Sequence, residues 1–120
     1  MVRISANLAL LLVAAVISLP AEPDAILVRL SEQDVLHAAT VRVQPEYPAM
    51  ARQLRLAGEV KVEVVIGPNG MVEKAKVLSG NMLLSSAAIA AVKKWRFDPG
   101  TLTPGKPSKV VSALGFSFKL

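Results

Sequence analysis

The chain has 120 residues, the length of one compact domain and too short for a two-domain enzyme. Its residues are 52% hydrophobic and 19% charged, a composition that supports a folded core. There is no cysteine and a single histidine, His37. Disulfides, thiol chemistry and a two-histidine metal or acid–base site therefore cannot be built from one chain, and the sequence predicts a protein that is not an enzyme and holds no cofactor or metal.

The charge balance is basic, with a formal net charge of +5. Residues 41–120 contain 12 Lys and Arg against five acidic residues. A basic domain can bind nucleic acid, but these cations are spread as single residues and aromatic residues make up only 4% of the chain. We therefore expect no nucleic-acid partner.

Residues 1–25 have the order of a secretory signal. A positive start at Arg3 precedes the apolar run from Leu8 to Leu19, and residues 20–24 end it with proline, small and acidic residues. As a helix this run rises only about 18 Å, against roughly 30 Å of bilayer hydrocarbon. We predict cleavage after Ala21 or Ala25, and a short uncleaved anchor is the alternative.

Residues 26–42 form a leading segment without a Pro-rich or Gly/Ser-rich spacer. Ile26, Val28 and Leu30 alternate with other residues and predict a short strand, and residues 31–34 resemble a capping box that opens a short helix through His37. We expect His37 to be an ordinary surface or boundary side chain.

A helix is expected over residues 49–57, with Pro48 in its first position and Gly58 as its left-handed cap. Its inward residues would be Met50, Ala51 and Leu54, and its outer ones Arg52 and Arg55. Residues 59–66 then alternate strictly between valine or isoleucine and other residues, which predicts a half-buried strand. The turn at residues 67–70, with Asn69 and Gly70, should return the chain as a hairpin whose second arm is residues 71–78.

A second helix is expected after Asn81, with one apolar stripe facing the sheet and Pro99-Gly100 ending it. The stripe consists of Leu84, Ala87, Ala88, Ala91, Val92 and Trp95. Trp95 and Phe97 are predicted core residues. Residues 109–120 predict a last strand, whose apolar face carries Val110, Leu114, Phe116, Phe118 and Leu120. Ser112 is the exception to this alternation, and we assign its side chain to the outer face.

Several of these pieces together resemble the C-terminal domain of TonB. They are residues 44–52 (QPEYPAMAR), residues 58–60 (GEV), the turn at 67–70 (GPNG), residues 77–80 (VLSG) and residues 95–99 (WRFDP). Their order and spacing are those of the family over residues 43–120. The resemblance implies an α+β domain with a three-stranded antiparallel sheet and two helices packed on one face. It also implies a periplasmic location and engagement of the outer-membrane receptors that import scarce nutrients.

The leader departs from the family pattern. By resemblance, TonB has an uncleaved membrane helix with a Ser and a His that couple to a proton-driven motor, followed by a long Pro-rich spacer. Here the position four residues after Ser5 is Ala9, the leader has no histidine, and the stretch from Glu22 to Val43 contains only 22 residues. We therefore expect a stand-alone, exported TonB-like domain that departs from the family pattern for motor coupling.

The expected mode of recognition is strand addition, because an edge strand offers unpaired N–H and C=O groups to an extended peptide. By resemblance, the receptor's N-terminal peptide pairs with residues 109–119, and residues 44–48 contact the receptor plug. The candidate partner-binding residues are Gln44, Pro45, Tyr47, Pro48, Arg52, Val111, Ala113, Gly115 and Ser117. The candidate structural residues are Gly58, Asn69, Gly70, Trp95, Phe97 and Pro99.

For several of these residues a purely structural interpretation remains an alternative. Tyr47 and Pro48 could simply fix the direction in which the first helix starts, and Arg52 could be a solvated helix charge. The alternative function is a cell-envelope scaffold that binds peptidoglycan or a partner through the basic surface around Lys93, Lys94 and Arg96. The same strand edge can also pair with a second copy to form a homodimer. Ser85 and Ser86 have no neighbouring base in the sequence, which argues against a hydrolase.

Overall fold

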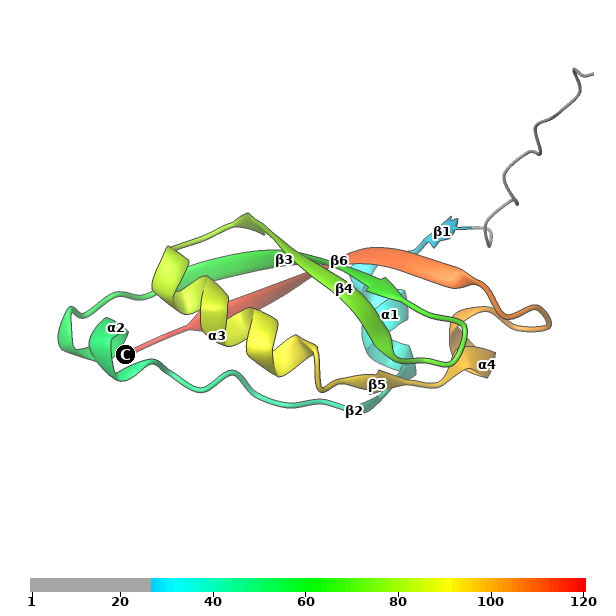
Figure 1. Cartoon of the computed structure of the whole chain (residues 1–120), viewed down its shortest axis with the longest axis horizontal. Helices are drawn as coiled ribbons and strands as arrows, with labels where there is room; N and C mark the ends of the chain where they lie inside the picture. Colours follow the sequence, from blue (N-terminus) through cyan, green and yellow to red (C-terminus); the bar gives the residue numbers. More distant parts are fainter. Residues whose placement is uncertain (1–26) are drawn as a thin grey trace, which may run out of the picture.

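The structure is a computed structural model that describes residues 27–120 (Figure 1). The predicted export signal or anchor, residues 1–25, and Ile26 lie outside the described residues, so those expectations remain predictions. In chain order the elements are β1 (Leu27–Arg29), α1 (Glu32–Ala38), β2 (Ala39–Val41), α2 (Ala49–Gln53), β3 (Gly58–Ile66), β4 (Val72–Ser79), α3 (Met82–Val92), β5 (Arg96–Phe97), α4 (Pro99–Leu102) and β6 (Lys109–Phe118).

The main sheet has four strands in the order β1-β6-β3-β4, and β2 pairs with β5 in a separate two-stranded ribbon. The expected antiparallel set is present as β4, β3 and β6, but the three-stranded description is incomplete because β1 adds to β6 in parallel. The sequence predicted a strand near Val28 without its partner, since strand pairing is non-local and has no signal of its own in so short a segment. The α+β class is confirmed.

The helices cover different parts of the sheet. α3 packs against β3 and β4, whereas α1 packs against β6 and α4 (Figure 1). The prediction of two helices on one face is thus incomplete, because residues 27–120 contain four helical segments. At the start of α1 the Ser31 hydroxyl accepts a hydrogen bond from the Asp34 N–H at 3.1 Å, which confirms the predicted cap.

The core is formed where α3 and the inner face of the sheet meet. Val60, Val62, Val64 and Ile66 of β3 are fully buried, as their alternation predicts. Trp95 and Phe97 are 6% and 3% exposed, which confirms both as core residues. The Trp95 ring contacts the ring of Phe116 edge-on, with 5.8 Å between ring centres.

The hairpin turn between β3 and β4 forms as predicted. The Gly70 N–H donates to the Gly67 carbonyl at 2.9 Å, and the Asn69 side-chain oxygen accepts from the Met71 N–H at 3.1 Å. Gly70 has a φ of 84°, a left-handed conformation that glycine adopts without strain. Its carbonyl accepts from the Phe97 N–H at 2.9 Å, which ties the turn to β5.

The first predicted helix is shorter than expected, because α2 ends at Gln53 instead of Ala57. Arg55 takes the left-handed conformation, with a φ of 56°, and the Leu56 N–H returns to the Ala51 carbonyl at 2.8 Å. These bonds close a helix end of the Schellman type, with arginine where glycine is usual. Gly58 is therefore the first residue of β3 and not the cap.

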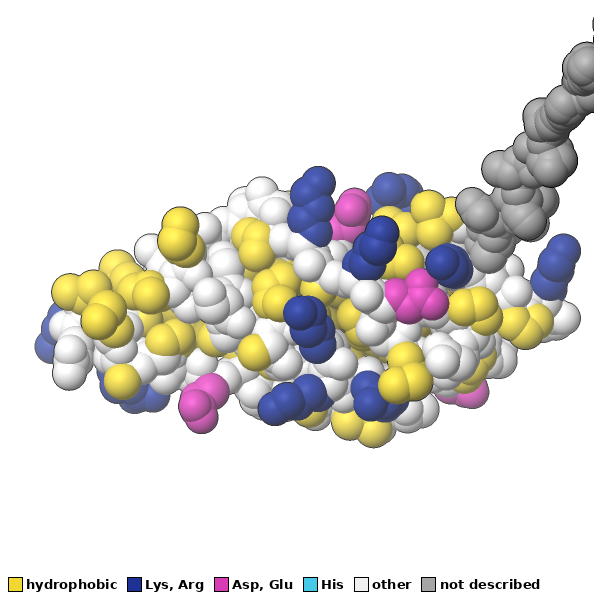
Figure 2. Space-filling model, viewed as in Figure 1, with side chains coloured by type: hydrophobic (Ala, Val, Ile, Leu, Met, Phe, Trp, Pro, Cys, Tyr) yellow, Lys and Arg dark blue, Asp and Glu magenta, His cyan; other side chains and the backbone are white. Residues whose placement is uncertain are grey.

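The inward face predicted for this helix is also wrong in part. Ala51 is buried, but Met50 and Leu54 are 58% and 60% exposed. A helix of five residues has little more than one turn, so it cannot hold three apolar residues against the core. The surface over α2 is accordingly rich in hydrophobic side chains (Figure 2).

The second predicted helix begins as expected and ends early. The Asn81 side chain accepts from the Leu83 N–H at 2.8 Å, and α3 stops at Val92. Residues 96–97 are extended as β5, and Pro99 is the first residue of α4 and not a helix stop. Pairing of β5 with β2 and burial of Phe97 outweigh the helical pattern that the alanines suggest.

The outer-face assignment of Ser112 is wrong. Its side chain is 1% exposed, and its hydroxyl has no hydrogen-bond partner within residues 27–120. Leu120, expected on the inner face, lies beyond the end of β6 and is 62% exposed. β6 therefore contributes its inner face only as far as Phe118.

Replacing Ser112 with alanine should stabilise the domain. An unpartnered buried hydroxyl costs about 1 to 3 kcal/mol, so we expect Ser112→Ala to raise the free energy of unfolding by about 1 kcal/mol. Urea unfolding measures this change. The matched control is Ser85→Ala, because Ser85 is also buried but its hydroxyl donates to the Asn81 carbonyl at 2.7 Å. That variant should lose stability, and a loss in Ser112→Ala of equal size would contradict the prediction.

Candidate functional site

The outer edge of β6 is defined by the direction of its backbone groups. The Val111 carbonyl accepts from the Leu30 N–H at 3.1 Å, and the Gly115 N–H donates to the Glu32 carboxylate at 2.9 Å. Both groups point away from β3. Pairing with β3 is regular from Val110 to Phe118, so the backbone groups of Ala113 and Ser117 point the same way.

The outer edge is not open along its whole length. β1 pairs with residues 109–111, and the Glu32 side chain occupies the N–H of Gly115. Of the four candidate residues on β6, Val111 is therefore covered by β1, and the N–H of Gly115 is already bonded to Glu32. The outward N–H groups of Ala113 and Ser117 have no hydrogen-bond partner within the described part of the chain. The accessible stretch of edge runs from Ala113 to Phe118 and is interrupted at Gly115 by the Glu32 carboxylate.

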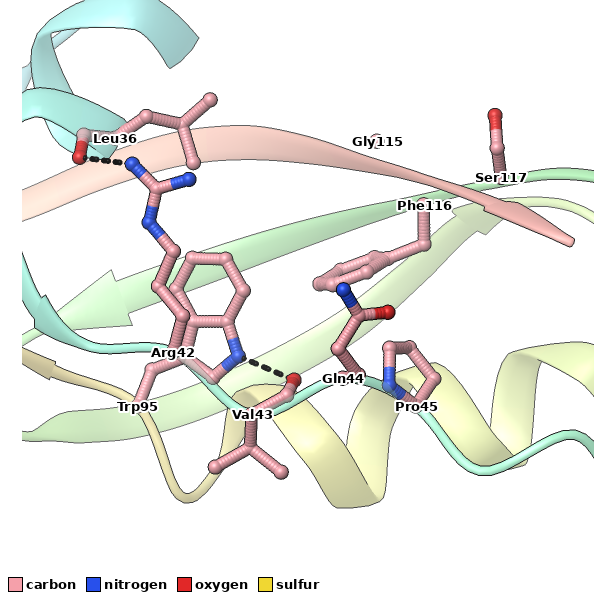
Figure 3. Close-up of a pocket in the computed structure, with 9 residues that line it drawn as sticks. All are labelled: Leu36, Arg42, Val43, Gln44, Pro45, Trp95, Gly115, Phe116 and Ser117. Atoms are coloured by element: carbon pink, nitrogen blue, oxygen red, sulfur yellow. Dashed lines mark hydrogen bonds between the residues drawn. The ribbon is translucent and has the colours of Figure 1, made fainter.

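A pocket of about 260 Å³ lies beside this accessible stretch. β6 contributes the residues 115–117 to it, and the extended segment between β2 and α2 contributes the residues 42–45 (Figure 3). Leu36 and Trp95 complete its lining. The structure thus brings Gln44 and Pro45 next to Gly115 and Ser117, which are about 70 residues away in sequence.

Tyr47, Pro48 and Arg52 lie outside this pocket. The Tyr47 hydroxyl donates to the Leu56 carbonyl, and its ring meets that of Phe118 edge-on at 5.5 Å. The Arg52 guanidinium lies 4.9 Å from the Tyr47 ring centre. Pro48 precedes α2 as its N-cap, instead of opening the helix, and lines a separate groove against α3. Tyr47 therefore holds α2 against the end of β6.

Arg42 is the charged residue of the pocket, and the sequence did not single it out. Its Nη2 donates to the Leu36 carbonyl at 2.7 Å, and its guanidinium lies 5.8 Å from the Trp95 ring centre (Figure 3). The sequence contains one usable signal for it. Side chains two residues apart in an extended segment lie on the same side, so Arg42 could have been grouped with Gln44.

Within residues 27–120 no three acidic or histidine side chains are grouped as metal ligands. None of the helices described in this range is long and apolar enough to cross a membrane.

This geometry defines a class of protein: a small α+β domain with a partly open strand edge beside a pocket. Residues 43–120 match the family described as Gram-negative bacterial TonB protein C-terminal. The match covers more than half of the chain, and the chain belongs to this family.

Individual relatives agree with this assignment. Protein TonB of Escherichia coli (strain K12) is 38% identical over 64 residues, which are 52% of this chain and 27% of that protein. Protein TonB of Vibrio cholerae serotype O1 is 32% identical over 89 residues, 69% of this chain and 36% of that protein. The chain thus spans about a quarter to a third of these relatives. The solution NMR structure of the Pseudomonas aeruginosa TonB CTD is 28% identical, with a TM-score of 0.57, and the match covers 77% of this chain and 92% of that one.

Proposed function

We propose that this chain is an exported, periplasmic TonB-like domain that engages outer-membrane TonB-dependent receptors by β-strand pairing. In this role it supports energy-coupled transport across the outer membrane and catalyses no reaction itself. Family membership supports the general role. The observation that carries the strand-pairing mode is the pair of unpartnered outward backbone groups on Ala113 and Ser117, beside a pocket that contains Gln44 and Pro45.

The accessible edge suits a short extended peptide. A strand advances about 3.3 Å per residue, so the stretch from Ala113 to Phe118 offers roughly 17 to 20 Å of edge. Main-chain hydrogen bonds along such an edge supply affinity, and alternate side chains supply specificity. A peptide on this stretch would have to take the Gly115 N–H from the Glu32 carboxylate, and a longer one would also have to displace β1, because both already lie on the same edge.

Proline substitutions on β6 test this mode. Ala113→Pro and Ser117→Pro remove N–H groups that point away from β3, so the domain should stay folded while peptide binding weakens. Loss of one or two hydrogen bonds and the bulk of the ring should weaken binding about tenfold or more. Isothermal titration with a synthetic peptide of a receptor N-terminus measures the affinity, and thermal melting checks the fold.

The matched control is a proline on the opposite edge of the sheet. The backbone groups of Val64 face β6, so its partner on β4, Ala75, is not hydrogen-bonded to β3 and the Ala75 N–H points to the free side of β4. Ala75→Pro should leave peptide affinity unchanged. If every folded β6 variant retains the parental affinity, strand pairing on β6 is rejected.

The second candidate is a cell-envelope scaffold that binds peptidoglycan or forms a homodimer. It is favoured by the outer edge of β4, which is not paired in the described residues, and by the exposed side chains of Lys93, Lys94 and Arg96. In that case the β6 prolines would have no effect on binding, Ala75→Pro would reduce self-association, and salt would weaken attachment to anionic polymers.

A further inference from the structure

Arg42 is held in place within the pocket beside β6. Its guanidinium is fixed at one end by the Leu36 carbonyl and lies over the Trp95 ring. The ring itself is fixed, because Trp95 is 6% exposed and its Nε1–H donates to the Val43 carbonyl at 3.0 Å. A guanidinium held on an aromatic platform loses little freedom when it binds a further group.

Arg42 has no counter-ion in residues 27–120. The one ion pair in this part of the chain joins Lys109 to Glu73, and the lining of the pocket contains no acidic residue. The Glu32 carboxylate lies on the same strand edge, but it accepts from the Gly115 N–H. A guanidinium has five N–H donors, and the Leu36 carbonyl uses one of those of Arg42. The others are available to a ligand.

The pocket lies where the side chains of an added strand would reach. Phe116 points from β6 into the pocket, whereas the Ser117 side chain points to the opposite face (Figure 3). Side chains alternate along every strand of a sheet, so every second side chain of a peptide on this edge would lie on the Phe116 side. One such side chain would enter the space between Phe116 and Arg42.

We propose that this pocket is a subsite for an acidic side chain of the partner peptide, with Arg42 as the residue that binds its carboxylate. The proposal rests on the proposed function. Arginine and carboxylate form paired, charge-assisted hydrogen bonds, and the apolar walls formed by Leu36, Val43 and Trp95 shield them partly from water. Arg42 then sets which peptides bind, through the position of one Asp or Glu.

A double-mutant cycle tests the assignment. The probes are synthetic receptor N-terminal peptides in which one Glu is moved along the sequence, each compared with its Gln counterpart. With the parental chain, Glu→Gln at one position should weaken binding about tenfold. With Arg42→Gln the same peptide change should cost less than about twofold. Arg55→Gln is the control, because Arg55 is exposed and does not line the pocket.

The outcomes separate this inference from the function on which it rests. A peptide that does not bind at all overturns both. Peptides that bind with equal affinity whether they carry Glu or Gln overturn only the Arg42 assignment. Dependence on a free peptide C-terminus, lost on amidation, also overturns it, since the ligand would then be a terminal carboxylate. Thermal melting of Arg42→Gln should match the parental chain within a few degrees, because Arg42 is exposed.

Discussion

Trp95→Ala should lower the free energy of unfolding by about 3 to 5 kcal/mol. The substitution empties the space between α3 and β6, where the indole meets Phe116 and Phe97. It also leaves the Val43 carbonyl without its donor and removes the platform under Arg42. Small domains have a total stability of about 5 to 15 kcal/mol, so this loss threatens folding itself.

Thermal and urea unfolding measure the effect. A loss of 1 kcal/mol shifts the melting temperature of a domain this small by about 4 to 8 °C, so a fall of roughly 15 °C or more is expected. Trp95→Phe is the informative control, because it retains most of the apolar contact but removes the N–H donor and part of the ring. It should cost about 1 to 3 kcal/mol. A Trp95→Ala variant that melts within two degrees of the parent would contradict the packing described above.

Gly70→Ala should be as damaging, at about 3 kcal/mol or more. A Cβ on Gly70 would overlap the carbonyl oxygen of Phe97 and lie 3.1 Å from its carbonyl carbon. Because the obstacle is backbone, no side-chain rotation relieves it. The turn would have to move away from β5, and the hydrogen bond from the Phe97 N–H to the Gly70 carbonyl would break.

Gly105→Ala separates this steric cost from conformational strain. Gly105 has a φ of 87°, nearly that of Gly70, but a Cβ there would meet nothing within 4 Å. Gly105→Ala should therefore lower the free energy of unfolding only by the strain of the left-handed conformation, about 1 to 2 kcal/mol. Equal losses in the two variants, measured by urea unfolding, would show that the contact between the turn and β5 contributes nothing.

Local chemistry predicted much of the fold. The β3 alternation, the turn at residues 67–70 and the caps at Ser31 and Asn81 all appear where the sequence indicated them. Each depends on residues within one turn or one strand. Such signals are complete in the sequence, because their partners are only two to four residues away.

Several of the failures concern contacts between distant segments. The sequence of residues 27–29 does not predict that they pair with the start of β6. The alanine-rich sequence of α3 likewise does not predict that the following residues form β5 and pair with β2. Ser112 was misplaced for a related reason. The predicted faces rested on residue polarity, whereas the structure buries Ser112 opposite Val64 of β3.

The candidate site was predicted by resemblance more than by physical pattern. Gln44, Pro45, Gly115 and Ser117 do lie together, but only the fold shows that one pocket joins them. A single arginine in an extended segment carries no motif, and the sequence signal for Arg42 is limited to its two-residue spacing from Gln44. Its setting depends on Leu36 and Trp95, which approach it only in three dimensions.

The parallel pairing of β1 with β6 has a mechanical consequence. β1, which begins at Leu27, and the C-terminus lie towards opposite ends of the described part of the molecule, and β1 and β6 both run towards the C-terminal end (Figure 1). Tension between these two ends would slide β1 along β6 instead of peeling it away. The hydrogen bonds between the two strands run across that direction, so they would bear the load together. Stretching single molecules by these two ends should therefore meet resistance first at the β1–β6 junction.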